Sequence, residues 1–226
     1  MPVQWRTPGG GGMGVVDLGR FEGDQVVLHF GGALTSVDAY TFANSLVAFA
    51  DTVRSVNGVI SPGQGIEVRL EALGDGSFRA VVKRLAKGLQ GFFADGAVRI
   101  FWALVAALIF DRLIRGDPHA RITVNTNEVV IEIGHDRVIV PRAVYEQMQN
   151  VRADPEVQKN LSRTFQAIEV DEAIDNFGLT PQKDDPEPIV QVPREHFHEL
   201  AAQIITEGDP KRRERIERAR LLILKL

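Results

Sequence analysis

The chain has 226 residues, with 26 Lys and Arg against 30 Asp and Glu, a formal net charge of −4, and 44% hydrophobic residues. This balance is typical of a soluble globular protein and argues against a nucleic-acid partner, since phosphate contacts need an excess of basic residues. Because the chain has no cysteine, disulfide frameworks, cysteine-ligated zinc, iron–sulfur clusters and thiol nucleophiles are excluded. No basic region followed by an apolar run opens the chain, so we expect a cytoplasmic protein.

The first third of the chain predicts a leader followed by strands and one helix. Residues 1–14 contain four adjacent glycines, Gly9 to Gly12, and are predicted to be a flexible leader. A strand is predicted over residues 25–32, and apolar residues spaced by three and four predict a helix from Thr35 or Ser36 to about Val56. Residues 66–73 alternate between apolar and charged, which predicts a strand with one exposed face. Residues 78–85 fit either a partner strand or the start of a helix.

The most unusual segment is a run of eleven apolar residues, 100–110, which lies within a helix predicted over about 97–115. Crossing a bilayer needs about 20 apolar residues, and runs of 10–14 are more often buried or interfacial. A helix that is apolar all round must be covered on every side. We therefore expect a core or an assembly interface here, with membrane insertion as the alternative. The side chains that would form this assembly or membrane surface are Ile100, Phe101, Trp102, Leu104, Val105, Leu108, Ile109 and Phe110.

The following segment reads as strands and then helices. Residues 120–133 and 137–140 are strand-like and are joined at Gly134-His135-Asp136, which predicts a hairpin. Pro141 suits the first turn of a helix. Asp154-Pro155 marks the start of another helix, which runs from Glu156 to Phe177 and ends at Gly178.

A domain boundary is predicted at residues 180–188, where three prolines and several charged residues resemble a linker. This divides a main domain of residues 15–179 from a C-terminal segment of residues 189–226. We expect a short strand at 189–192 and a helix from about 193 to 206 in that segment. It is either the start of a truncated second domain or an end that packs on another copy of the chain.

Two polar clusters are candidate sites. Residues 211–225 hold seven basic residues against two glutamates, and they are either a solvated helix or a patch that contacts anionic lipid or nucleic acid. The basic patch consists of Lys211, Arg212, Arg213, Arg215 and Arg218. On a helix, Glu195, His198 and Glu199 would share a face and are the candidate metal ligands. They match no specific metal motif, so we expect a solvated face with no metal and no cofactor.

No catalytic motif is evident elsewhere in the chain. His135 and Asp136 lie at a predicted hairpin tip, and no serine stands in a G-x-S-x-G context. We therefore expect no catalytic residues, apart from a hydrolase alternative that would use the Glu195–Glu199 cluster.

Residues 25–80 resemble the N-terminal part of uncharacterised bacterial and phage proteins that occur in mobile elements and anti-phage defence neighbourhoods. The resemblance is carried by Phe30-Gly-Gly, Ser36-Val-Asp-Ala-Tyr, Asn44-Ser-Leu-Val-Ala-Phe, Glu67-Val-Arg and Gly76-Ser-Phe. It implies a genomic context and carries over no functional residue.

Together these patterns predict an α+β fold in which antiparallel hairpins pack with three or four helices, one of them apolar all round. We expect a non-enzymatic self-assembling or partner-binding module of a defence-type system, as a homo-oligomer or with a protein partner. One alternative is a membrane-associated effector that inserts the helix at 97–115. The other is the hydrolase.

Overall fold

A computed structural model describes residues 14–32, 36–71, 78–86, 100–115, 118–185 and 187–202. The predicted leader, the basic patch at residues 211–218 and the first residues of the helix expected at 97–115 lie outside this part of the chain. The described residues form an α+β fold with two sheets, as the sequence predicted.

The described residues contain nine strands, five α-helices and two 3-10 turns. The strands are β1 (Val15–Asp17), β2 (Gln25–Gly31), β3 (Ile66–Glu71), β4 (Phe78–Ala86), β5 (Arg121–Val124), β6 (Glu128–Ile133), β7 (Asp136–Pro141), β8 (Asn176–Thr180) and β9 (Val190–Pro193). The α-helices are α1 (Ala39–Ile60), α3 (Phe101–Ile114), α4 (Arg142–Val151), α5 (Pro155–Glu169) and α6 (Phe197–Ala201), and two 3-10 turns are η1 (Leu18–Arg20) and η2 (Arg194–His196).

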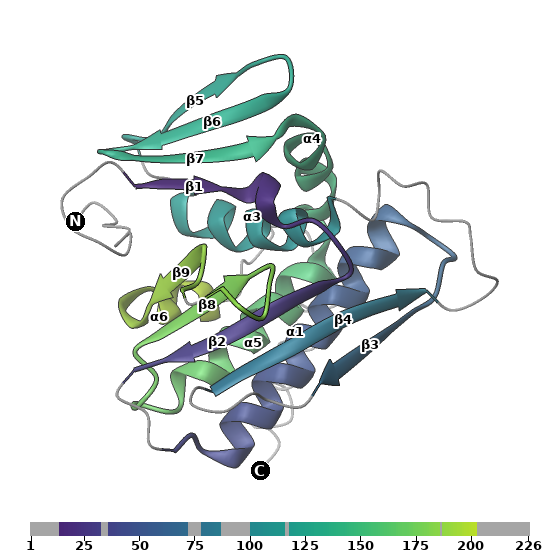
Figure 1. Cartoon of the computed structure of the whole chain (residues 1–226), viewed down its shortest axis with the longest axis vertical. Coiled ribbons are helices and arrows are strands. Elements are labelled where there is room, and N and C mark those ends of the chain that lie inside the picture. The colour runs from purple at the N-terminus through teal and green to yellow at the C-terminus, as the bar shows by residue number, and fades with distance from the viewer. Residues whose placement is uncertain are drawn as a thin grey trace, which may run out of the picture.

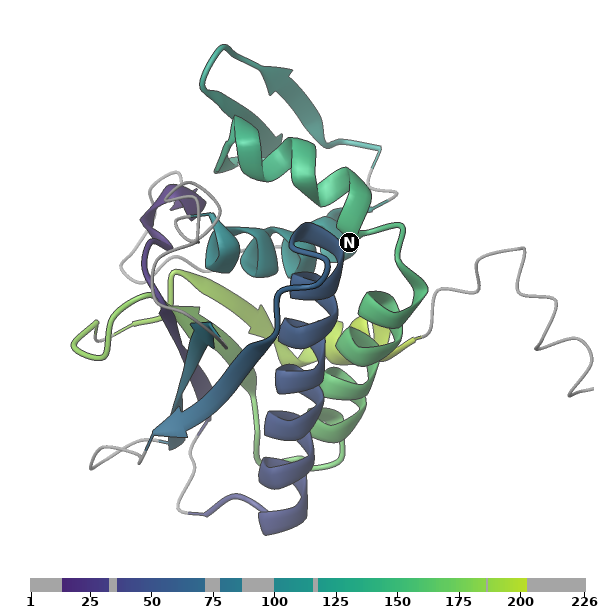
Figure 2. The same ribbon diagram turned by 90° about the vertical axis from the view of Figure 1, so that its right-hand side faces the viewer.

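The two sheets are packed around one apolar core. The smaller sheet has the strand order β1-β7-β6-β5 and the larger one β3-β4-β2-β8-β9, and all neighbours are antiparallel except β1 and β7. Figure 1 shows α3 between the two sheets, and α4 packs on β6 and β7. Helices α1 and α5 lie side by side against the larger sheet, as the turned view in Figure 2 shows.

Helix α1 begins and ends later than predicted, because its N-cap is Asp38, which follows the predicted start at Thr35 or Ser36. The carboxylate of Asp38 accepts a hydrogen bond from the N–H of Thr41 at 2.8 Å, which satisfies one free donor of the first turn. The helix continues past Asn57 to Ile60. The side-chain amide of Asn57 donates to the carbonyl of Gln64 at 2.7 Å, so this residue ties the next loop to the helix instead of ending it.

Helix α3 is buried along its whole length, from Phe101 to Ile114. Its polar end is held by charged contacts, since Asp111 pairs with Arg115 and with Arg152, which follows α4. Arg112 donates to Ser162 Oγ of α5 at 2.8 Å and to the carbonyl of Ala202. Burial lowers the pKa of Arg112 to about 10, so this side chain stays charged at neutral pH. Of the settings expected for this helix, the structure shows the core.

Helix α5 starts as predicted and ends earlier. Asp154 accepts hydrogen bonds from the N–H groups of Glu156 and Val157, and Pro155 occupies the first turn. The helix ends at Glu169, whereas Phe177 and Gly178 belong to β8. The prediction that Gly178 caps the helix is therefore wrong.

The reason is tertiary packing at β8. The ring of Phe177 lies edge-on to that of Phe165, with the ring centroids 5.6 Å apart. A Cβ added to Gly178 would lie 2.5 Å from the Cβ of Pro188, so the glycine allows the loop after β8 to pack closely on the strand. These contacts place residues 176–180 in the sheet.

The proline-rich segment after Thr180 is a hairpin loop rather than a boundary between domains. It joins β8 to β9, which pair antiparallel, and Val190 and Val192 belong to the same core as β2 and α5. In place of the helix expected from about residue 193, the structure shows η2 followed by α6, which ends at Ala201, and residues 203–206 of the expected helix lie outside the described residues. Because Phe197 and Leu200 are also in this core, residues 190–201 form part of the main body.

Candidate functional site

The apolar side chains of α3 do not form an exposed surface. Of its candidate contact residues, those from Phe101 to Phe110 are at most 2% exposed, and Ile100 is half-buried. The chain itself covers these side chains, so in this structure they are not available to a partner or a lipid. No helix in the described part of the chain has the length and hydrophobicity that spanning a membrane requires.

The histidines and glutamates near α6 are arranged differently from the sequence expectation. His196 lies 3.6 Å from a carboxylate oxygen of both Glu195 and Glu199, whereas His198 lies 3.1 Å from Glu169 of α5. Glu195, His198 and Glu199 do not share a face, because residues 194–196 form a 3-10 turn and the α-helix begins only at Phe197. Among the described residues, no group of three His, Cys, Asp or Glu could hold a metal ion.

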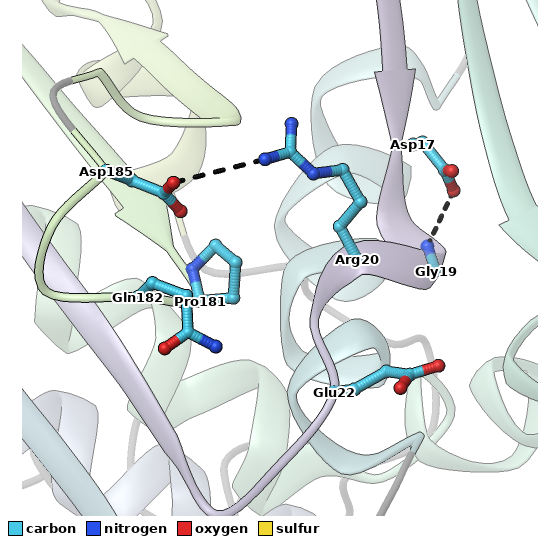
Figure 3. Close-up of a pocket in the computed structure, with 7 residues that line it drawn as sticks. All are labelled: Asp17, Gly19, Arg20, Glu22, Pro181, Gln182 and Asp185. Atoms are coloured by element: carbon cyan, nitrogen blue, oxygen red, sulfur yellow. Dashed lines mark hydrogen bonds and ion pairs between the residues drawn. The ribbon is translucent and has the colours of Figure 1, made fainter.

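A polar pocket of about 510 Å³ lies between η1 and the loop after β8 (Figure 3). Arg20 faces Asp185 across it, with 4.0 Å between the charged groups, and the Asp17 carboxylate accepts the N–H of Gly19 at 2.8 Å. The lining residues are Asp17, Gly19, Arg20, Glu22, Pro181, Gln182 and Asp185. Since carboxylates outnumber guanidinium groups in this lining, it is suited to N–H donors or cations. Sequence patterns gave no signal for this pocket, because its two sides are far apart along the chain.

Polar side chains next to the pocket hold the loop in place. The Nε2 atom of His29 lies 2.9 Å from Thr180 Oγ1, and this hydroxyl lies 3.2 Å from the carbonyl of Gln182. Because the hydroxyl donates to that carbonyl, we assign the proton of His29 to Nε2. Arg79 donates to the carbonyls of Lys183 and Asp185.

His29 is therefore a neutral structural group. Burial lowers its pKa from 6.5 to about 4, the positive charge of Arg79 acts in the same direction, and Asp185 opposes both. Thr180 is fully buried, so its hydroxyl is out of reach of a substrate. The arrangement anchors the loop and positions Asp185 at the pocket.

Besides the polar pocket, β5, an edge strand of the smaller sheet, is a candidate site. It pairs with β6 on one side, and all four of its residues are exposed. Ile122 is 50% exposed and lies opposite the buried Ile131, and Val124 is 57% exposed and lies opposite the buried Val129. Since opposite residues in a ladder point to the same side, the apolar face of this sheet continues past the core onto an uncovered strand.

Among the described residues, no strand pairs with the outer side of β5, so the backbone groups that point to that side are open at the same two residues. The N–H of Asn125 donates to the carbonyl of Glu128 at 2.8 Å. Hydrogen-bonded and non-bonded pairs alternate along an antiparallel ladder. Thr123 and Arg121 therefore bond to β6 like Asn125, whereas Ile122 and Val124 direct their N–H and C=O groups away from the sheet.

The other edges in the described part of the chain are better protected. Strand β3 carries an exposed ion pair between Glu67 and Arg69 at 2.9 Å, β9 ends at Pro193, and β1 has only three residues. Charges, proline and short length are the usual means by which edges avoid further pairing. We call Ile122, Thr123 and Val124 the β5 edge.

The sequence pattern does not reveal this edge, because residues 120–133 are strand-like throughout. Asn125 and Asn127, which favour turns, are the signal that could have divided them into two strands.

Comparison of the chain with protein-family models, curated proteins and solved structures gives no match.

Proposed function

We propose that this protein is a non-enzymatic assembly module that binds an extended strand at the β5 edge. The observation that carries the proposal is the coincidence, at Ile122 and Val124, of exposed apolar side chains with outward backbone groups. In strand addition, main-chain hydrogen bonds supply affinity and alternate side chains supply specificity. The β5 edge offers both. The defence-type context implied by the resemblance of residues 25–80 is part of this proposal.

The expected affinity is modest. Full burial of an Ile or Val side chain contributes about 1.5–3 kcal/mol, and Ile122 and Val124 are already half covered. Each backbone hydrogen bond adds about 0.5–1.5 kcal/mol. Association itself costs roughly 4–15 kcal/mol. A contact confined to this edge is therefore weak and reversible, and a strong complex requires further buried surface.

The experiment uses a synthetic peptide with the sequence of residues 120–126, acetylated and amidated at its ends. It is titrated to millimolar concentration into ¹⁵N-labelled protein. Because an added strand bonds to the outward groups, we expect chemical-shift changes confined to β5 and β6, and slower hydrogen exchange at the amides of Ile122 and Val124.

The matched control is Val124→Pro. The N–H of Val124 points away from β6, so proline removes an outward donor without breaking the existing ladder. We expect the variant to keep its fold and lose the response to the peptide. Unchanged spectra of the original protein, or an equal response in the proline variant, would overturn the proposal.

A further inference from the structure

The outward groups of β5 are arranged symmetrically about Thr123. Ile122 and Val124 each direct one N–H and one C=O away from the sheet, and Thr123 between them is bonded to β6. In an antiparallel pair, two facing residues with such groups exchange two hydrogen bonds. A strand with the same pattern and opposite direction therefore satisfies all four groups, and β5 of another copy is such a strand.

We infer that the partner at the β5 edge is a second copy of this chain, paired antiparallel through β5 about a two-fold axis at Thr123. Ile122 then lies opposite the partner's Val124, and Val124 lies opposite the partner's Ile122. This inference rests on the proposed function. It joins the two smaller sheets into one continuous sheet of eight strands.

The register is selected by the backbone. Displacing one strand by a single residue sets an outward residue against one whose groups already bond to β6, so the new hydrogen bonds are lost. If the axis passes through Ile122 or through Val124, only the residue on the axis faces an outward residue of the partner's β5. The other outward residue then faces a residue beyond the end of that strand. The axis at Thr123 is the arrangement in which both outward residues of both strands are used.

The side chains agree with this register. Ile122 and the partner's Val124 share the face that carries the buried Ile131 and Val129, so the two apolar edges cover each other. On the opposite face, Thr123 lies beside the partner's Thr123. Arg121 faces the partner's Asn125, so no like charges are directly opposite each other.

The test exploits the absence of cysteine from the chain, which makes Thr123→Cys a protein with a single thiol. At the axis, the two residues form a non-hydrogen-bonded pair with Cα atoms about 4.5 Å apart, which is within the range of a disulfide. Under a mild oxidant we expect a covalent dimer that a reducing agent dissociates. Thr126→Cys, on the exposed turn beyond β5, is the matched control.

We expect Thr123→Cys to form a dimer at least about tenfold faster than Thr126→Cys, because pairing raises the local concentration of the thiol. Adding Val124→Pro to Thr123→Cys should bring the rate down to that of the control. Circular dichroism of each reduced variant checks that the fold is intact, and sedimentation equilibrium of the original protein should show a reversible dimer.

Equal rates of dimer formation in the three variants would overturn the two-fold pairing. If the peptide of residues 120–126 still binds β5 in that case, strand addition stands and a second copy is not the partner. If the peptide also fails to bind, both the proposed function and this inference are refuted.

Discussion

Replacing His29 with glutamine should remove much of the sensitivity of this fold to mild acid. His29 is buried on β2 with its Nε2 atom 2.9 Å from Thr180 Oγ1, and burial lowers its pKa from 6.5 to about 4. In the unfolded chain the imidazole of His29 becomes protonated near pH 6.5, whereas in the folded chain it becomes protonated only near pH 4. The contribution of neutral His29 to the free energy of unfolding is therefore fully present above pH 6.5 and is lost as the pH falls toward 4.

The size of this loss follows from the two pKa values. A pKa lowered from 6.5 to about 4 corresponds to about 3 kcal/mol when the pH is below both values. About 2 kcal/mol of that should be lost between pH 7.5 and pH 5. Glutamine does not titrate, and its amide can donate to Thr180, so the free energy of unfolding of His29→Gln should lack this component.

The assay is urea unfolding of both proteins at pH 7.5 and pH 5, followed by circular dichroism. The original protein should lose about 2 kcal/mol more than His29→Gln over this interval. The reasoning is refuted if the original protein and His29→Gln lose the same stability, or if NMR finds His29 titrating near pH 6.5.

Substitutions at three further positions test the packing and one helix cap, each by urea or thermal unfolding. Leu104→Ala removes a fully buried side chain of α3 and should cost about 2–5 kcal/mol, whereas Leu104→Met should cost less than about 1.5 kcal/mol; equal costs would place this side chain outside a packed core. Asp154→Ala should cost about 1 kcal/mol, because two backbone N–H groups lose their acceptor. Asp154→Ser should keep most of the stability of the original protein, because serine is also a good N-cap residue. Gly178→Ala should cost about 1–3 kcal/mol, since the new Cβ would meet Pro188; an unchanged melting temperature would contradict this.

Local signals in the sequence located several elements well. The Asp154-Pro155 pair specifies the start of α5 through its own side chain and ring, so no distant contact is needed. The alternation in residues 66–71 likewise indicated a strand, which the structure shows as β3. The ambiguous residues 78–85 form β4, a choice that depends on pairing with β2 and β3.

Patterns of apolar residues located helices better than they identified the buried side. On α1 the apolar residues spaced by three and four include Tyr40 and Val47 as well as Leu46 and Val53. Tyr40 is 80% and Val47 is 54% exposed, whereas Leu46 and Val53 are buried. A helix with apolar residues on two sides does not indicate which side meets the sheet. That depends on where β2 and α5 lie.

The sequence alone was sufficient to exclude cysteine chemistry and to predict that the helix around residues 100–110 needs cover, because composition and continuous hydrophobicity are properties of the chain itself. Only the tertiary structure shows that the same chain covers this helix and that Phe177 belongs to a strand instead of the predicted helix. It also places Arg20 opposite Asp185 at a pocket. It also left Ile122 and Val124 uncovered at the sheet edge. These outcomes depend on which distant segments pack together, and periodicity within one segment carries no information about its neighbours in space.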